Sequence, residues 1–318
     1  MNARQIVNIK KFASSKNIVL YLLVFLVVLM SVLIGNFLTF DNVRNIFISF
    51  SVYGVTTIAM TFAIICGEFD LSVGSIMAMT SLIFAKVTGS SGLLAGMLLG
   101  LLIGFAVGAL NGVIIAKGKI PSFVATLGTS IVIKGIALYY TDGYQVPVYD
   151  DVAFKIGNGM IAQIPYLVLI FFSLLLIAWF VLKYTRFGRN IYAVGGSFEM
   201  AKLAGIKADF YKFIIFIILG VSASISGVMM TCRIAAGNAL YGTDLTMSAV
   251  SAVVIGGTSL IGGTGGVWRT LAGLLVMSIL FNALTLLGMQ AYIQQLFRGL
   301  IVIVVVVTDA LIRKREEE

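Results

Sequence analysis

Long apolar segments recur along this chain from about residue 18 to residue 312, with short polar stretches between them. An α-helix needs about 20 mostly apolar residues to cross the hydrocarbon core of a bilayer. Such segments occur about ten times, which predicts an all-α integral membrane protein with about ten transmembrane helices. The predicted spans are residues 18–38, 45–66, 72–88, 92–116, 122–140, 165–183, 211–231, 245–260, 268–287 and 293–312.

The composition fits a lipid environment and not an aqueous one. Charged residues make up 11% of the chain and hydrophobic residues 60%, whereas about a quarter of the residues of a soluble globular protein are charged. The net charge of +9 could suit nucleic acid, but the basic residues form no continuous stripe along one surface. We therefore expect the lipid bilayer, and no nucleic acid, as the partner of this surface.

Residue types that carry covalent chemistry are scarce in this sequence. The chain has no histidine and only two cysteines, Cys66 and Cys232. Histidine is the commonest general base and the commonest transition-metal ligand. We expect no catalytic residues, no metal site and no cofactor bound by this chain. A membrane-embedded enzyme is an alternative, but it lacks any cluster of nucleophile and base.

The distribution of basic residues predicts the topology, because cytoplasmic loops of membrane proteins are enriched in Lys and Arg. With an even number of spans and cytoplasmic N- and C-termini, the outside loops hold only Arg44, Lys155 and Arg233. Lys86, Lys134 and Arg298 fall within spans. The inside residues are Arg4, Lys10, Lys11, Lys16, Lys117, Lys119, Lys183, Arg186, Arg189, Lys202, Lys207, Lys212, Arg269, Arg313, Lys314 and Arg315.

The chain, residues 1–318, is predicted to form a single transmembrane domain. Its two halves contain similar motifs: Asp70-Leu-Ser-Val-Gly follows the second span, and Asp244-Leu-Thr-Met-Ser follows the seventh. Asn111 and Asn282 lie late in the fourth and ninth spans. Two halves with five spans each must have opposite orientations, which predicts a 5+5 inverted repeat of the kind found in transporters. Chance similarity between apolar helices is the alternative.

Two carboxylates interrupt the apolar sequence in the segment 67–75, where Glu68 and Asp70 stand among glycine and serine residues. Ionisable groups at membrane depth are costly and normally face the bundle interior or water. We predict that this segment lines a translocation pathway. Alternatively, Asp70 caps the helix that follows it. The predicted pathway residues are Glu68, Asp70, Ser72, Asn111, Asp244, Thr246 and Asn282.

The inside loop 183–212 is the longest cytoplasmic feature, and helix-to-helix connections usually take only about 2–8 residues. Residues 197–203 can form a short helix that Ser197 caps and Gly205 ends. A short helix flanked by basic residues suits docking into a groove on a partner protein.

Two glycine patterns have packing explanations. The run 253–266 is rich in glycine, but no Gly-Lys-Ser/Thr closes it and no strand precedes it, as a P-loop requires. We expect this run to bend or pack the chain at a helix end, and we expect ATP to bind another subunit. Glycines 92, 96, 100, 104 and 108 recur every fourth residue and predict close contact between helices.

Several of these motifs, in the same order, resemble the permease family that includes the ribose, xylose, arabinose and galactose importers of bacteria. The similarity runs from about Asn36 to Arg313. Its most specific parts are residues 67–75, 111–129, 185–196, 199–206 and 252–268.

The resemblance implies the permease subunit of an ATP-binding-cassette importer that moves a small sugar, of the pentose or hexose class, across the bacterial inner membrane. It implies a dimer with a second copy or a paralogue, a cytoplasmic ATPase that uses the ATP, and an extracytoplasmic sugar-binding protein. Within the loop 183–212, it implies that the ATPase-coupling residues are Arg186, Phe187, Gly188, Arg189, Glu199, Ala201, Gly205 and Ile206.

The sequence also departs from the family pattern. Members commonly have Gly-Ile where this chain has Glu68-Phe69, and often acidic residues where it has Thr246 and Ser248. These departures leave the identity of the sugar open. The alternative function is an ion-coupled secondary transporter of a small polar solute, driven through Glu68 and Asp70. Such a transporter would not need the long cytoplasmic loop.

Overall fold

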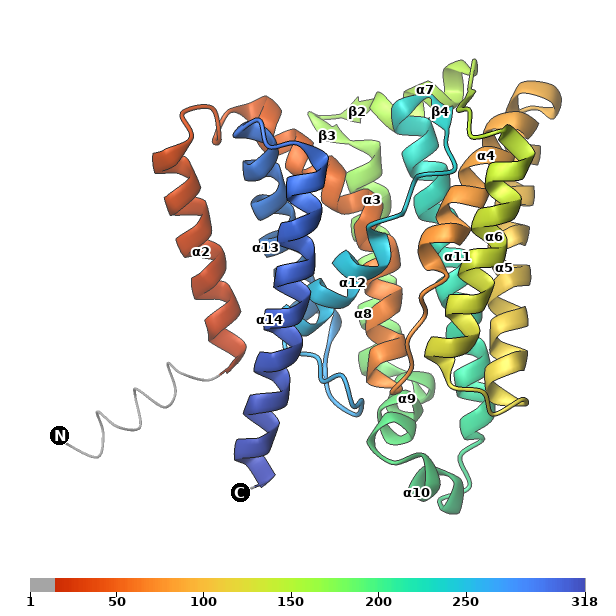
Figure 1. Ribbon diagram of the computed structural model, residues 1–318, viewed down its shortest axis with the longest axis vertical. Helices are drawn as coiled ribbons and strands as arrows, with labels where there is room; N and C mark the ends of the chain where they lie inside the picture. The colour runs from red at the N-terminus through yellow and green to blue at the C-terminus, as the bar shows by residue number, and fades with distance from the viewer. Residues whose placement is uncertain (1–14, 318) are drawn as a thin grey trace.

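The structure, a computed structural model, describes residues 15–317 (Figure 1). These residues form thirteen helices and four strands of two residues each. The helices are α2 (Ser15–Leu33), α3 (Phe40–Ile65), α4 (Val73–Ser91), α5 (Leu93–Ala116), α6 (Ser122–Thr141), α7 (Asp151–Asn158), α8 (Tyr166–Tyr184), α9 (Arg186–Gly196), α10 (Phe198–Leu203), α11 (Ala208–Ile234), α12 (Leu245–Ile255), α13 (Val267–Leu286) and α14 (Ala291–Glu317). Strand β1 (Val146–Pro147) pairs with β4 (Ala236–Gly237), and β2 (Met160–Ile161) pairs with β3 (Ile164–Pro165).

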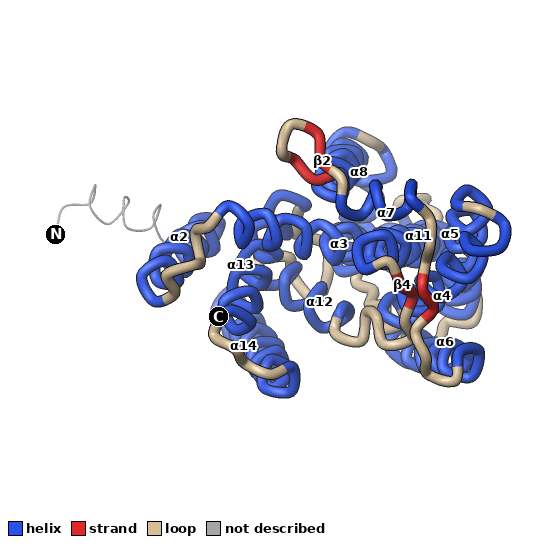
Figure 2. Tube along the Cα trace, turned by 90° about the horizontal axis from the view of Figure 1, so that it is seen from above, coloured by secondary structure: helices blue, strands red, loops and turns tan. Residues whose placement is uncertain are grey.

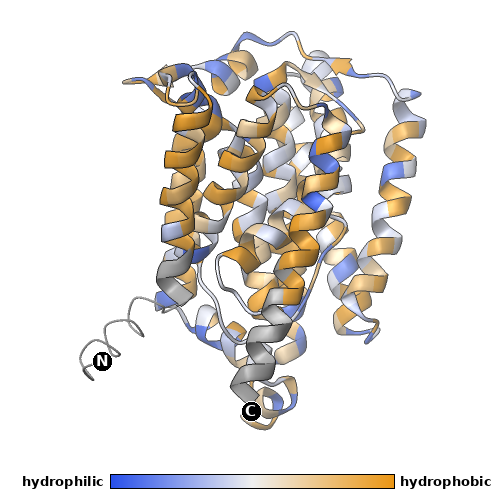
Figure 3. Ribbon diagram, turned by 60° about the vertical axis from the view of Figure 1, so that its left-hand side comes forward, coloured by the Kyte–Doolittle hydropathy of each residue, from blue (hydrophilic) through white to orange (hydrophobic). Residues whose placement is uncertain are grey.

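Each predicted span contains one apolar helix, and seven of these helices are long and apolar enough to cross a bilayer by themselves. Those seven are α3, α4, α5, α6, α8, α11 and α13. The apolar parts of α2, α12 and α14 are shorter. Figure 3 shows mainly hydrophobic residues along the helices, with a few hydrophilic residues within them and more in the connections at both ends. The all-helical membrane fold is therefore confirmed.

The prediction of a full span over residues 245–260 is wrong, because α12 has only 11 residues. At 1.5 Å per residue it is about 16 Å long, roughly half the thickness of the hydrocarbon core. The chain turns at Gly256 and Gly257 and then forms the glycine-rich loop. Gly263 donates a backbone hydrogen bond of 2.8 Å to the Ile65 carbonyl at the end of α3. The glycine-rich run thus packs a helix end, as predicted.

The helices gather on two sides of α3. Figure 2 shows α2, α13 and α14 on one side and α4, α5, α6 and α11 on the other. The short helices α9 and α10 lie at one end of the bundle, and α7 lies at the other (Figure 1). Helix α2 begins and α14 ends at the α9 end. The basic residues Arg4, Lys10 and Lys11, on which the cytoplasmic location of the N-terminus depends, lie outside the described residues.

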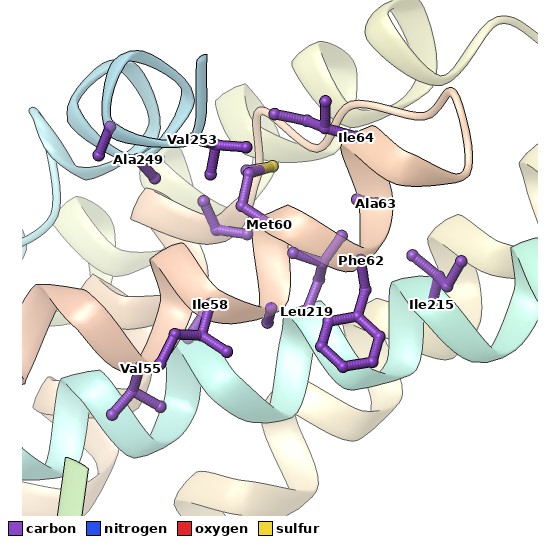
Figure 4. Packing of buried hydrophobic residues seen from close by; sticks show 14 of the residues in the cluster. Val55, Ile58, Met60, Phe62, Ala63, Ile64, Ile215, Leu219, Ala249 and Val253 are labelled. Atoms are coloured by element: carbon purple, nitrogen blue, oxygen red, sulfur yellow. The ribbon is translucent and has the colours of Figure 1, made fainter. Parts of the chain in front are cut away.

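Helix α3 is the centre of the apolar core. Val55, Ile58 and Phe62 of α3 are buried next to Ile215 and Leu219 of α11 (Figure 4). On another side, Ala249 and Val253 of α12 lie close to α3 (Figure 4). Most of α3 is buried against apolar neighbours. Its polar residues Asn42, Asn45, Ser49, Tyr53 and Thr57 are spaced by three or four residues and so share one face of the helix.

Glycines bring α5 close to its neighbours α4 and α11. A Cβ atom on Gly104 would collide with the Gly220 carbonyl of α11, and one on Gly108 would collide with the Phe216 carbonyl. Gly96 and Gly100 pack in the same way against Phe84 and Thr80 of α4. The predicted glycine face is confirmed for these four positions. Gly92 is different, because it precedes α5, has a φ of +86° and has no atom near its missing Cβ.

Two stretches of irregular backbone lie inside the bundle, one immediately before α4 and the other immediately before α12. Residues 66–72 connect α3 to α4, and residues 235–244 connect α11 to α12. In Figure 1 both stretches enter the bundle from its ends, and α4 and α12 begin part of the way through it. The starts of α4 and α12 are in close contact. A Cβ atom added to Gly74 would overlap the carbonyl oxygen of Gly242. Irregular backbone at membrane depth is tolerated only where protein or a water-filled cavity surrounds it.

Candidate functional site

The irregular segment 66–72 is held by polar side chains from the first turns of α6. The backbone N–H of Phe69 donates to Ser122 Oγ at 3.3 Å, and that of Leu71 donates to Thr126 Oγ1 at 3.0 Å. An unpaired backbone N–H in an apolar medium costs several kcal/mol. These hydroxyls therefore allow the chain to leave helical geometry inside the bundle.

Three predicted pathway residues meet in one buried hydrogen-bond network. Asp70 Oδ1 accepts from Ser72 N–H at 2.7 Å and from Ser72 Oγ at 2.6 Å. Asn111 Nδ2 donates to Ser72 Oγ at 2.9 Å, and Thr129 Oγ1 donates to Asn111 Oδ1 at 2.7 Å. Asp70, Ser72 and Asn111 are fully buried. The network joins the start of α4 to α5 and α6, and linked hydrogen bonds of this kind polarise one another.

The capping alternative for Asp70 holds only in an altered form. Ser72 immediately precedes α4, and its side chain makes no capping bond to the helix. The carboxylate of Asp70 bonds to Ser72 and not to the amides of the first helical turn, so it closes a tight Asx-type turn before the helix. Its second oxygen, Oδ2, is buried without a hydrogen-bond partner among the described residues.

Glu68 does not join this network but faces the α9 end of the bundle. The buried Glu68 carboxylate forms an ion pair with Lys212 near the start of α11. Lys212 Nζ also lies 4.4 Å from the centre of the Phe198 ring, and Lys202 Nζ lies 4.5 Å from the same ring. Because Phe198 is the first residue of α10, Lys212 contacts both the short helix and the irregular segment.

The short helix predicted over 197–203 is confirmed as α10. Ser197 caps it, since its Oγ accepts from Met200 N–H at 3.3 Å. Gly205 follows the helix with a φ of +81°, a conformation that glycine adopts without strain. Glu199 and Gly205 are exposed, Ile206 is half-buried, and Ala201 is buried beneath the helix.

The earlier part of the loop forms α9, which Thr185 caps by accepting from Gly188 N–H at 3.2 Å. Phe187 packs on Tyr211 of α11 with ring centres 5.5 Å apart. Gly188 is buried against the backbone of Leu182. Of the four predicted coupling residues in α9, Arg186 and Arg189 are the ones exposed to the surroundings.

A second polar region lies on the other side of α3, around a cavity of about 400 Å³ between α3, α12, α13 and α14. The predicted residues Asp244 and Asn282 line it. Asp244 forms an ion pair with Arg298 of α14. Asn282 and Asn42 exchange hydrogen bonds of 2.8 and 3.0 Å.

Sequence reasoning missed several polar residues of this cavity: Asn42, Tyr53, Arg233 and Arg298. The signal for Arg298 was its place within a predicted span, because a cation at membrane depth needs a partner. The last predicted pathway residue, Thr246, lines a separate cavity of about 90 Å³ with Ser75 of α4 and Lys134 of α6. The predicted residues thus fall into separate groups and not into one continuous line.

This chain is a bundle of apolar helices that encloses irregular backbone and buried polar networks, an arrangement typical of membrane transport proteins. It belongs to the family described as branched-chain amino acid transport system / permease component, whose model matches residues 42–306. The chain is 36% identical to the ribose import permease protein RbsC of Haemophilus influenzae, over 90% of both chains. It is 37% identical to RbsC of Bacillus subtilis, over 89% of both chains.

A third relative is the L-arabinose transport system permease protein AraH of Escherichia coli, which is 35% identical over 88% of this chain and 85% of its own length. No solved structure gives a significant match to this chain. The resemblance to the monosaccharide permeases is therefore confirmed. The chain is a multi-pass permease of the inner membrane, and the relatives named above are permease proteins.

Proposed function

We propose that this chain is the transmembrane subunit of an ATP-driven importer for a pentose or another small sugar. The observation that carries this proposal is the 36% identity to a ribose import permease over 90% of both chains. An arabinose permease is almost as similar, at 35% identity. Both named sugars are pentoses, so a pentose is the first substrate to test.

We propose a 5+5 inverted repeat for the architecture. Helices α2 to α6 form the first half, and α8 with α11 to α14 forms the second. In Figure 1, α3 runs towards the α9 end while α11 runs away from it. Each is followed by irregular backbone and then by a helix that begins inside the bundle. This opposite course of equivalent elements supports the repeat.

The cavity that contains Asp244 and Asn282 has the chemistry of a sugar pathway. Amides, a phenol, a carboxylate and guanidinium groups line it together with the ring of Phe281. Sugar hydroxyls donate and accept hydrogen bonds, and aromatic rings pack on the apolar faces of sugar rings. Arg298 has a buried Nε–H without a partner among the described residues. A passing hydroxyl oxygen could accept a hydrogen bond from it.

Coupling to a cytoplasmic ATPase would use α10. We propose that the ATPase docks on the exposed surface around Glu199 and Gly205. Movement of the ATPase would be transmitted to the bundle through Phe198 and Lys212, because Lys212 is ion-paired with Glu68 on the segment 66–72. The same segment contains Asp70 and leads into α4. A displacement of α10 would therefore act directly on the irregular backbone.

Uptake by purified components tests the function. The permease is reconstituted in liposomes with the ATPase and the sugar-binding protein, and uptake of labelled ribose, arabinose, glucose and leucine is measured. We expect uptake of a pentose that requires ATP hydrolysis and is unchanged when ionophores abolish the proton and sodium gradients. Uptake without the ATPase that stops with ionophores would establish the ion-coupled alternative. ATP-dependent uptake of leucine alone would contradict the sugar substrate.

A double substitution tests the docking surface: Glu199→Ala with Gly205→Ala. We expect uptake to fall roughly tenfold or more, while the permease stays folded and the ATPase still hydrolyses ATP. A Cβ at the left-handed Gly205 costs about 1–2 kcal/mol and displaces the end of α10. Uptake and ATP hydrolysis are measured in the same liposomes.

The control for this variant is Lys117→Ala, an exposed position in the connection between α5 and α6. It should leave both activities unchanged. Normal uptake by the double variant would remove α10 from the coupling route.

A further inference from the structure

A cavity of about 410 Å³ opens at the α9 end of the bundle, between the end of α8, helix α9 and the start of α13. It lies apart from the polar groups described above and shares only Arg189 with the predicted coupling residues. Its walls combine two kinds of side chain, indole rings and cations. This combination gives it a chemistry of its own.

The chain has only two tryptophans, and both line this cavity. Trp179 of α8 and Trp268 of α13 lie edge to face with ring centres 6.3 Å apart. Tryptophan is enriched where membrane proteins cross from hydrocarbon to headgroups, because the indole has an apolar body and a polar N–H. The cavity is thus built of residues that suit the depth of lipid headgroups.

Three cations surround the indoles: Lys183, Arg189 and Arg269. None of them takes part in the ion pairs found within residues 15–317. Lys183 Nζ lies 5.3 Å from the centre of the Trp179 ring and 5.1 Å from the centre of the Tyr184 ring. Tyr192 donates to the Gly265 carbonyl at 2.9 Å and fixes the loop before α13. Among the described residues, the lining of this hollow contains these three cations and no acidic side chain.

The apolar surface of α8 leads into this hollow. Leu176, Phe180 and Lys183 share one face of the helix, because they are spaced by four and then three residues. Leu176 and Phe180 are exposed, at 50% and 56% of their surface. An acidic protein segment would leave these apolar side chains uncovered, whereas the acyl chain of a lipid would cover them.

We infer that this hollow binds the headgroup of an anionic phospholipid. The lipid phosphate lies among Lys183, Arg189 and Arg269, and an acyl chain runs along Leu176 and Phe180. Basic pockets between helices at the membrane surface suit anionic lipid headgroups, and guanidinium groups match phosphate oxygens in pairs. The lipid would brace α9 against α8 and α13, next to the helix that we propose couples to the ATPase.

The two tryptophans make the test specific, since tryptophan fluorescence of the isolated permease reports from this cavity alone. The detergent-solubilised full chain is titrated with phosphatidylglycerol that carries bromine on its acyl chains, which quenches nearby indoles. We expect saturable quenching by brominated phosphatidylglycerol and much weaker quenching by brominated phosphatidylcholine. Glycerol 3-phosphate, which has the phosphate without acyl chains, should compete poorly. Strong competition by glycerol 3-phosphate would identify a soluble phosphate site instead.

The substitutions Lys183→Gln and Arg269→Gln, alone and together, should weaken phosphatidylglycerol binding, by roughly tenfold or more for the pair. Lys117→Gln, an exposed cation elsewhere, should leave it unchanged. If the double variant fails to fold, the two single variants still provide the comparison. Equal quenching by both lipids, or unchanged affinity in the pair, would overturn the inference. So would loss of quenching on addition of the ATPase, because the partner protein would then occupy the hollow. None of these measurements depends on transport.

Discussion

Replacing Lys212 with methionine is expected to lower sugar uptake roughly tenfold or more and the free energy of unfolding by about 3 kcal/mol. Methionine keeps the length of the side chain but leaves the Glu68 carboxylate buried without its cation. Breaking a buried pair costs about 3–5 kcal/mol, and the lower end applies because the Lys212 side chain is 22% exposed. Uptake in liposomes and denaturant-induced unfolding in detergent measure the two effects.

A charge swap distinguishes the contribution of the ion pair from the contributions of the two individual residues. The double variant Glu68→Lys with Lys212→Glu should recover a large part of the stability that either single variant loses. Lys207→Met is the matched control, because Lys207 lies just before α11, is exposed and has no ion pair within residues 15–317. Wild-type stability and uptake of Lys212→Met would show that the pair neither stabilises the segment 66–72 nor transmits movement to it.

Asp70→Asn is expected to lower uptake to a similar extent while the permease still assembles with its ATPase. The substitution removes the charge that strengthens the two hydrogen bonds from Ser72, each of which contributes about 1.5–3 kcal/mol when one partner is charged. It also places two amide hydrogens in a buried site where Oδ2 has no partner among the described residues. Uptake and copurification of the ATPase are the measurements.

The comparison variant for Asp70 is Asp41→Asn near the start of α3. Asp41 is exposed and pairs with Arg44 on the surface, and surface pairs of this kind contribute about 0–1 kcal/mol. Loss of folded protein on Asp70→Asn, with Asp41→Asn unaffected, would mean that Asp70 serves only to close the turn before α4. Full uptake by Asp70→Asn would exclude a role for its charge in transport.

Hydropathy predicted the positions of the helices well, but it predicted a full span over residues 245–260, where α12 has only 11 residues. Residues 245–260 form one apolar run, so a window over the sequence treats them as one crossing. The glycines at 256 and 257 end the helix after 11 residues. Gly257 has a left-handed φ of +83°, whereas the role of Gly256 depends on another element, because a Cβ there would collide with the Arg269 backbone of α13. A single sequence contains no record of that contact.

The candidate site was predictable where its residues are local in sequence. Asp70 and Ser72 are two residues apart, and their turn was foreseeable from residue type. Glu68 stood out in the sequence as an ionisable group in an apolar stretch, but its cation lies far along the chain on α11. The same is true of Asp244 and Arg298. Ion pairs between distant residues depend on how the helices pack, and neither spacing nor composition reveals that.

The glycine contacts between α5 and α11 limit how this protein can change shape. At Gly104 and Gly220 the two backbones touch without side chains between them, so neither helix can slide along the other without steric collision. We therefore expect α4, α5 and α11 to move together as one rigid body during transport. The elements that would turn against it are α13 and α14, which line the polar cavity of about 400 Å³ together with part of α3. The Asn42–Asn282 amide pair joins α13 to α3 there, and the Asp244–Arg298 ion pair joins α14 to the segment before α12.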